Sequence, residues 1–79
     1  MKFDKYGFVS IVNLRDDSGV GSSIELSYHP LYNRVRETKH FDDGTVSTLT
    51  FDFDDFETSN YGSDGEVFLD FISEHFPED

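Results

Sequence analysis

The chain has 79 residues, which allows one domain (residues 1–79) with a modest core and leaves little material for a deep catalytic cleft. Seventeen acidic and six basic side chains give a formal net charge of −11 at pH 7, which disfavours direct binding to nucleic acid or to an anionic membrane. Cysteine is absent, so disulfides and zinc–thiolate sites are excluded; no apolar stretch has signal-peptide or membrane-spanning length, and we expect a soluble cytoplasmic protein. Nine phenylalanines and four tyrosines supply the apolar surface that a disordered acidic tail lacks.

Alternating apolar and polar residues predict four β-strands, because successive side chains of a strand point to opposite faces. The expected segments are residues 6–14, 23–28, 33–41 and 45–54, with a loop over 15–19 between the first two. Asp43-Gly44 predicts a tight hairpin between the last two strands, since glycine readily adopts the positive φ of such turns. In the last strand we expect Leu49, Phe51 and Phe53 on one face, and Asp52 and Asp54 on the other.

A helix is expected to follow the strands. Ser63 and Glu66 have the spacing of a capping box, in which each side chain bonds to a backbone amide at the helix start. Apolar residues then recur at helical spacing and are expected to face the core: Val67, Phe68, Phe71, Ile72 and Phe76. The predicted fold is α+β, a four-stranded antiparallel β-meander with one C-terminal helix packed on its apolar face.

Charge is distributed unevenly along the chain. Residues 42–79 hold twelve carboxylates and no lysine or arginine, whereas all six basic side chains lie in residues 1–41. A surface of one sign favours a positively charged partner, and we expect eight carboxylates to meet it: Asp52, Asp54, Asp55, Glu57, Asp64, Glu66, Asp70 and Glu74. A solvated acidic face that only confers solubility stays open as an alternative, and so does adaptation to high salt.

The helical acids are placed at a cost in stability. Glu66, Asp70 and Glu74 are spaced four residues apart, so they lie above one another on one helix face. Like charges at this spacing destabilise a helix by about 0.2–0.5 kcal/mol per pair. This cost favours an interaction surface over a purely solvated one.

Catalytic and metal sites are not indicated by any motif. The run 52–57 does not match the calcium-binding loop of EF-hands, because Glu57 and Ser63 occupy the positions that require glycine and glutamate. A weak divalent-cation site stays open as an alternative. His29, His40 and His75 lack metal-ligand spacing and are expected in a loop, on a strand surface and on a helix flank. No nucleophile or phosphate-binding motif occurs, so we expect a non-enzyme without a cofactor.

The basic residues Arg34, Arg36 and Lys39 are expected to have an internal role. Arg34 and Arg36 fall on one strand face, and the hairpin places the acidic strand beside them. They should therefore pair with that strand rather than contact nucleic acid.

In its small size, acidity, lack of cysteine and meander-plus-helix pattern, the chain resembles small phage-encoded inhibitors, including anti-CRISPR proteins and other DNA mimics. The resemblance rests on residues 51–57 and on Glu66, Asp70 and Glu74; it is one of type, covers about half of the chain and assigns no residue a role. It implies a non-catalytic protein of the host-cell cytoplasm that occupies the nucleic-acid channel of a bacterial defence complex.

The leading hypothesis is an acidic inhibitor that binds a basic nucleic-acid-binding protein, such as a CRISPR effector complex, and blocks DNA or RNA binding. Exposed aromatic side chains such as Tyr61 or Tyr32 would act as anchors. One alternative is an immunity protein or antitoxin that neutralises a basic nuclease. Another is a soluble structural domain.

Overall fold

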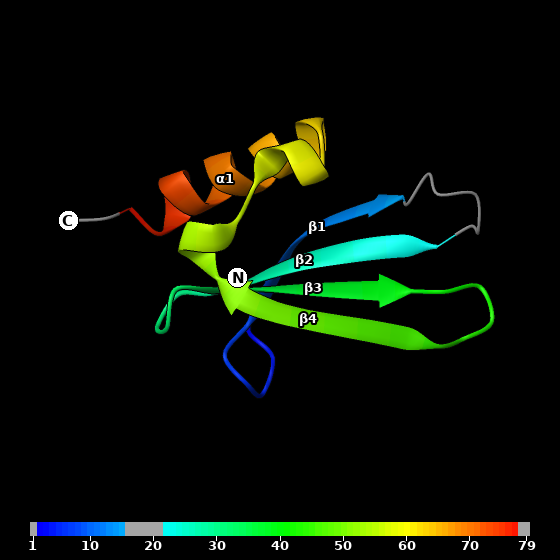
Figure 1. Cartoon of the computed structure of the whole chain (residues 1–79). Helices are drawn as coiled ribbons and strands as arrows, with labels where there is room; N and C mark the ends of the chain where they lie inside the picture. Colours follow the sequence, from blue (N-terminus) through cyan, green and yellow to red (C-terminus); the bar gives the residue numbers. More distant parts are fainter. Residues whose placement is uncertain (1, 16–21, 78–79) are drawn as a thin grey trace.

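The computed structural model describes residues 2–15 and 22–77, which form one antiparallel sheet with a C-terminal helix packed against it (Figure 1). The strands lie in the order β1 (Val9–Arg15), β2 (Ser23–His29), β3 (Arg34–His40) and β4 (Val46–Asp52). The 3₁₀ turns η1 (Phe53–Asp55) and η2 (Thr58–Asn60) then lead into α1 (Ser63–His75). The predicted four-stranded meander with a C-terminal helix is confirmed. The loop expected over 15–19 lies outside the described residues, except for Arg15 at the end of β1.

The strand register sorts the side chains into two faces, because residues directly opposite each other in an antiparallel pair share a face. Val12, Leu26, Glu37 and Leu49 form one row across the four strands on the face that α1 covers. The core contains Leu26 and Val35 from the sheet and Phe68 and Ile72 from α1, and it runs on to Val9, Val12, Ile24 and Tyr28.

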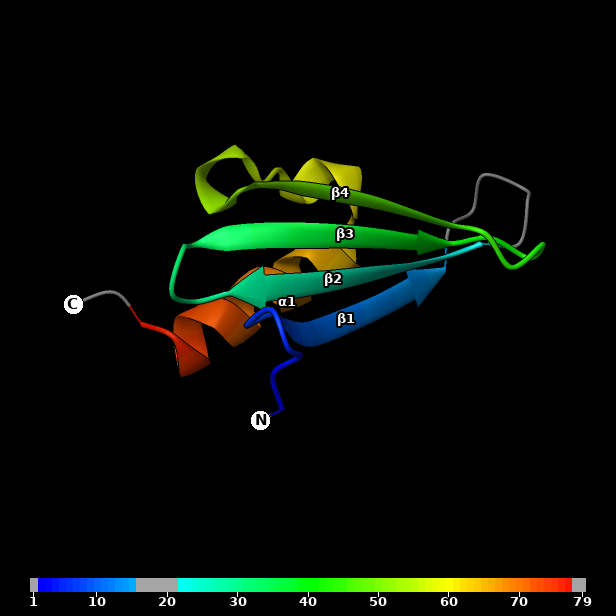
Figure 2. The same ribbon diagram turned by 90° about the horizontal axis from the view of Figure 1, so that it is seen from below.

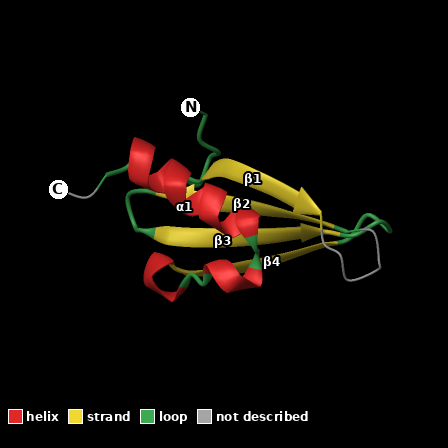
Figure 3. Cartoon of the chain, turned by 90° about the horizontal axis from the view of Figure 1, so that it is seen from above, coloured by secondary structure: helices red, strands yellow, loops and turns green. Residues whose placement is uncertain are grey.

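The helix covers only part of this face. α1 lies over the end of the sheet near the β2–β3 connection, and the strands extend well beyond it toward the β3–β4 hairpin (Figure 1). Seen from the helix side, α1 crosses β1 and β2, while η1 and η2 lie on the β4 side (Figure 3). Val67, which was expected in the core, is 55% exposed, because α1 presents Phe68 and Ile72 to the sheet instead.

The β3–β4 hairpin follows the prediction. Gly44 has a φ of 90°, and its amide donates to the Phe41 carbonyl at 3.0 Å, while the Phe41 amide donates to the Thr45 carbonyl at 2.9 Å. The Asp43 carboxylate accepts from the hydroxyl and the amide of Thr45 at 2.6 and 2.9 Å. These hydrogen bonds lower the pKa of Asp43.

Aromatic packing ends β4 earlier than predicted. The Phe53 amide still donates to the Asn33 carbonyl at 2.9 Å, but the Phe53 ring turns onto Tyr28 with centroids 5.4 Å apart. The ring of Phe56, one 3₁₀ turn later, packs on the ring of Phe68 of α1, with centroids 5.0 Å apart. Each turn toward α1 buries aromatic surface that an extended strand would leave in water. The prediction that the strand continues to Asp54 is therefore wrong.

The predicted capping box is also wrong. The N-cap of α1 is Gly62, with φ 61° and ψ −140°, and Ser63 is already the first helical residue. No side chain of the described residues caps the first turn, and the Gly65 amide instead donates to the Gly62 carbonyl at 3.1 Å. Glycine adopts this backbone conformation without a Cβ clash, which is why the helix begins there.

The segment before β1 lies on the opposite face at one end of the sheet, near the start of β1 and the end of β2 (Figure 2). The Asp4 carboxylate accepts from the amides of Tyr6 and Phe8 at 2.9 and 3.0 Å, which holds this segment in a turn. Phe8 then packs against Arg36 and against the ring of His29, with centroids 5.0 Å apart in the second case. His29 was expected in a loop, but it ends β2, is buried and hydrogen-bonds the Tyr6 carbonyl through Nε2 at 2.9 Å.

Candidate functional site

Residues 53–77 form a layer of one charge sign above the sheet. This acidic layer consists of η1, η2, α1 and their connections, and it contains no lysine or arginine. Six of its carboxylates are exposed and that of Asp64 is half-buried; the set is Asp54, Asp55, Glu57, Asp64, Glu66, Asp70 and Glu74. Within residues 2–15 and 22–77, none of the seven takes part in an ion pair. The charge split along the sequence thus becomes a split between two layers of the fold.

Two arginines lie on the far face of the sheet, where other acids neutralise them. Arg34 pairs with Asp52 at 3.5 Å, as predicted, although both side chains are more than half exposed and the pair adds little stability. Arg36 pairs with Asp4 at 2.8 Å rather than with β4. Partial desolvation raises the pKa of Asp4, but its hydrogen bonds and Arg36 outweigh this and lower the pKa overall.

Asp52 is therefore separated from the other predicted site residues. It shares the far face with Arg34, as the register of β3 and β4 requires. Asp54 belongs to η1 and not to β4, so the prediction that Asp52 and Asp54 share a strand face is wrong. The remaining seven predicted residues lie in the acidic layer.

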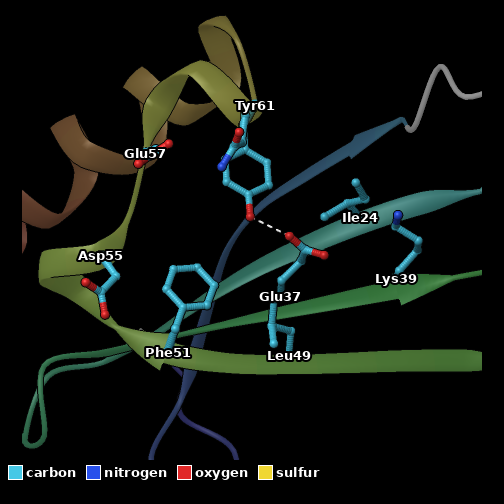
Figure 4. A pocket seen from close by; sticks show the side chains of 9 residues that line it. Ile24, Glu37, Lys39, Leu49, Phe51, Asp55, Glu57 and Tyr61 are labelled. Atoms are coloured by element: carbon cyan, nitrogen blue, oxygen red, sulfur yellow. Dashed lines mark hydrogen bonds between the residues drawn. The ribbon is translucent and has the colours of Figure 1, made fainter.

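Asp55 and Glu57 line a cleft of about 440 Å³ between the acidic layer and the exposed part of the sheet (Figure 4). Ile24, Leu49 and Phe51 contribute its apolar surface. Its charged lining is acidic on balance, because Glu37 joins Asp55 and Glu57 against the single ammonium of Lys39. A cationic side chain with an apolar stem fits this combination.

Tyr61 closes one side of the cleft. Its hydroxyl donates a hydrogen bond to Glu37, and its ring stacks on Phe56 with an interplanar angle of 6°. Burial raises the pKa of Tyr61, and the hydrogen bond and the negative charge of Glu37 raise it further. Tyr61 therefore connects the layer to the sheet from a half-buried position, whereas Tyr32, the other proposed anchor, is 68% exposed.

Asp54 lies beside a second hollow of about 450 Å³, between η1 and the C-terminal half of α1. Tyr28, Phe53 and Phe76 supply much of its aromatic lining. The neighbours Asp54 and Asp55 thus line two different hollows.

The helical acids form the predicted exposed row. Glu66, Asp70 and Glu74 are all exposed, while Phe68 and Ile72 of the same helix are buried. The carboxylates of this row, of η1 and of Glu57 lie on different parts of the layer, so they do not converge on a point. Among the described residues, no group of three or more potential metal ligands comes together. No helix in this part of the chain is long and apolar enough to cross a membrane.

The sequence did not indicate the roles of Glu37 and Lys39 in the cleft. Both alternate with Arg36 and Thr38 along β3, and strand alternation alone would place them on the face that carries Val35. Strand alternation could not indicate that α1 stops short of Glu37 and Lys39 and leaves this part of the sheet face uncovered. The comparisons with known proteins add nothing further, because no family model, no curated protein and no solved structure matches the chain.

Proposed function

We propose that this protein is a non-catalytic acidic inhibitor, which binds a basic nucleic-acid-binding protein and blocks its access to DNA or RNA. The observation that supports the proposal is the single charge sign of the acidic layer, from Phe53 to Pro77. Lysine and arginine side chains that hold phosphates can hold these carboxylates through the same charge-assisted hydrogen bonds.

The exposure of these carboxylates supports the same function. A structural domain gains stability when acids and bases alternate on its surface, yet the helix row of Glu66, Asp70 and Glu74 forgoes every such pair within the described residues. A basic partner would relieve this repulsion on binding. Relief of the repulsion that destabilises the isolated protein would therefore add to the affinity of the complex.

The test compares two triple variants that lose the same number of charges. The first neutralises the η1–η2 connection with Asp54→Asn, Asp55→Asn and Glu57→Gln. The matched control neutralises acids outside the acidic layer with Glu25→Gln, Asp42→Asn and Asp52→Asn, all of which lie in the sheet or its hairpin. Circular dichroism verifies that both variants fold.

Each protein is immobilised and used to capture binding proteins from a bacterial lysate at low and at high salt. The proposal expects the wild type and the control triple to retain a basic protein at low salt and to release it at high salt, because screening weakens exposed charge pairs. The wild type should also displace labelled DNA or RNA from the captured protein, and the first triple should fail in both assays. Equal capture and displacement by the two triples would contradict a specific role of Asp54, Asp55 and Glu57, and failure of the wild type to capture any basic protein would mean that the acids only confer solubility.

The captured protein also separates the two inhibitor hypotheses. If it is a nuclease that belongs to no defence complex and whose cleavage activity the wild-type chain suppresses, the protein is an immunity protein or antitoxin. If it binds nucleic acid without cutting it, or belongs to a defence complex, blocking of the binding channel is the function.

A further inference from the structure

β4 is an open edge of the sheet. It is the last strand in the order β1-β2-β3-β4, and all of its residues except Phe51 are exposed. The hydrogen bonds from the Phe41 amide to the Thr45 carbonyl and from the Phe53 amide to the Asn33 carbonyl show which alternate residues of β4 bond to β3. In an antiparallel edge strand, the backbone groups of alternate residues bond to the neighbouring strand, and those of the residues between them point away from it. In β4 the amides and carbonyls of Val46, Thr48 and Thr50 point away from the sheet.

Within residues 2–15 and 22–77, the opposite edge of the sheet is protected and the edge at β4 is not. β1 has an irregular register between Ser10 and Val12, and Phe3 forms a bridge with Val9. Helix α1 also packs against β1. By contrast, β4 pairs with β3 in an unbroken register, and it contains no lysine, proline or glycine to discourage a further strand.

The open edge lies beside the acidic cleft. Leu49 in the middle of β4 is 57% exposed and lines that cleft together with Asp55 and Glu57. Figure 4 shows Leu49 and Phe51 on β4, and Asp55 and Glu57 on the segment that follows it. A strand added next to β4 would place alternate side chains beside Leu49 and within the field of these carboxylates.

We propose that β4 accepts an extended basic segment of the partner as a fifth, antiparallel strand, an inference that rests on the proposed function. Main-chain hydrogen bonds to Val46, Thr48 and Thr50 would hold the segment, as in other cases of strand addition. On the side facing the acidic layer, an apolar side chain packs on Leu49, and lysine or arginine side chains meet Asp55 and Glu57.

Charge selects this occupant over a second copy of the chain. Each copy has a formal net charge of −11, and pairing β4 with β4 would bring two such copies together. An extended cationic segment gains both the ladder hydrogen bonds and the attraction of the cleft, whereas a second copy gains the ladder against repulsion.

The test uses a pair of synthetic peptides with equal charge. The first is Arg-Thr-Val-Thr-Arg-Thr-Arg, which in an extended conformation carries arginine and valine on one face and threonine on the other. The second has the same sequence with N-methylated threonines, which can no longer donate to an adjacent strand. We expect the first peptide to bind at least about tenfold more tightly. We also expect it to slow hydrogen exchange at the amides of Thr48 and Thr50.

A pair of protein variants checks the same edge. Thr50→Pro removes an outward-pointing amide and leaves the inward ladder of β4 intact, whereas Thr50→Val keeps the amide and serves as the control. The proline variant should lose the difference between the peptides, and the valine variant should keep it. If both peptides bind the wild type equally, strand addition is wrong while the charge-based function stands.

Two other results would overturn the inference in different ways. Failure of both peptides to bind at low salt contradicts the proposed function as well as the fifth strand. Concentration-dependent dimers in sedimentation, with protected Thr48 and Thr50 amides in the absence of peptide, would identify a second copy as the occupant.

Discussion

The hydroxyl of Tyr61 donates a hydrogen bond to the carboxylate of Glu37, and this contact joins the acidic layer to the middle of β3. The two residues come from opposite sides of the charged cleft, and 24 positions separate them in the sequence. Within the described residues, side chains of the layer and of the inner strands are joined by this hydrogen bond and by aromatic packing. It therefore adds a polar link between the layer and the sheet beside the cleft.

Tyr61→Phe should lower the free energy of unfolding by about 1 kcal/mol, because it leaves a half-buried carboxylate without its donor while preserving the stack on Phe56. Urea denaturation followed by circular dichroism measures the change. Tyr32→Phe is the control, since Tyr32 is 68% exposed, and it should leave stability unchanged. Equal effects of the two substitutions would show that the bond to Glu37 contributes nothing.

The same bond predicts a loss of stability in alkaline solution. The pKa of Tyr61 is raised above its usual value of 10.0, so the folded state holds this proton more tightly than the unfolded state. The resulting stabilisation is fully present below pH 10 and declines as the pH rises above it. In denaturation curves measured on both sides of pH 10, Tyr61→Phe should lose less stability than the wild type. Parallel pH profiles would contradict the prediction.

Gly7→Ala should be far more damaging than Gly44→Ala, although the two glycines have similar φ angles of 94° and 90°. Each substitution imposes a backbone cost of about 1–2 kcal/mol. A Cβ at Gly7 would also lie 2.5 Å from Nε2 of His29, whereas nothing lies within 4 Å at Gly44. Overpacking should add about 1–3 kcal/mol at Gly7 alone. Thermal unfolding of both variants measures the difference, and equal losses would rule out a close contact with His29.

Asp70→Lys should stabilise the protein and weaken binding of the proposed partner. Asp70 lies one helical turn from both Glu66 and Glu74, so a lysine there replaces two repulsions with two attractions and adds about 1 kcal/mol. The melting temperature should rise while capture of the basic partner declines. Asp70→Asn, which removes the repulsion without adding a positive charge, should fall between the two proteins in both measurements. Unchanged or stronger binding by the lysine variant would contradict a contact between the helix row and the partner.

The sequence predicted the fold well where local patterns and packing agree. The predicted strands β2 and β4 and the Asp43-Gly44 turn all appear in the structure. The predicted end of β4 is wrong because aromatic side chains outweigh the local pattern there. Phe53 continues the alternation of β4 in sequence but turns onto Tyr28, and the chain leaves the sheet.

The candidate site was predictable in composition but only partly in arrangement. Alternation correctly placed Asp52 and Leu49 on different faces of the sheet. Because α1 packs on the face that carries Leu49, Asp52 is separated from the acidic layer. The cleft and the open edge of β4 depend on how far α1 extends over the sheet. That extent follows from the packing of Phe68 and Ile72, which no spacing of residues in the sequence encodes.

The separation of charge between the two layers also gives the molecule an electric dipole moment across the sheet. Its negative end is the side of α1, η1 and η2, and at the opposite end Arg34 and Arg36 offset the charges of Asp52 and Asp4. In the field of a positively charged body this dipole experiences a torque that turns the helical side forward. The torque acts at separations up to the Debye length, about 8 Å at physiological salt, so the molecule is oriented before any side chains touch.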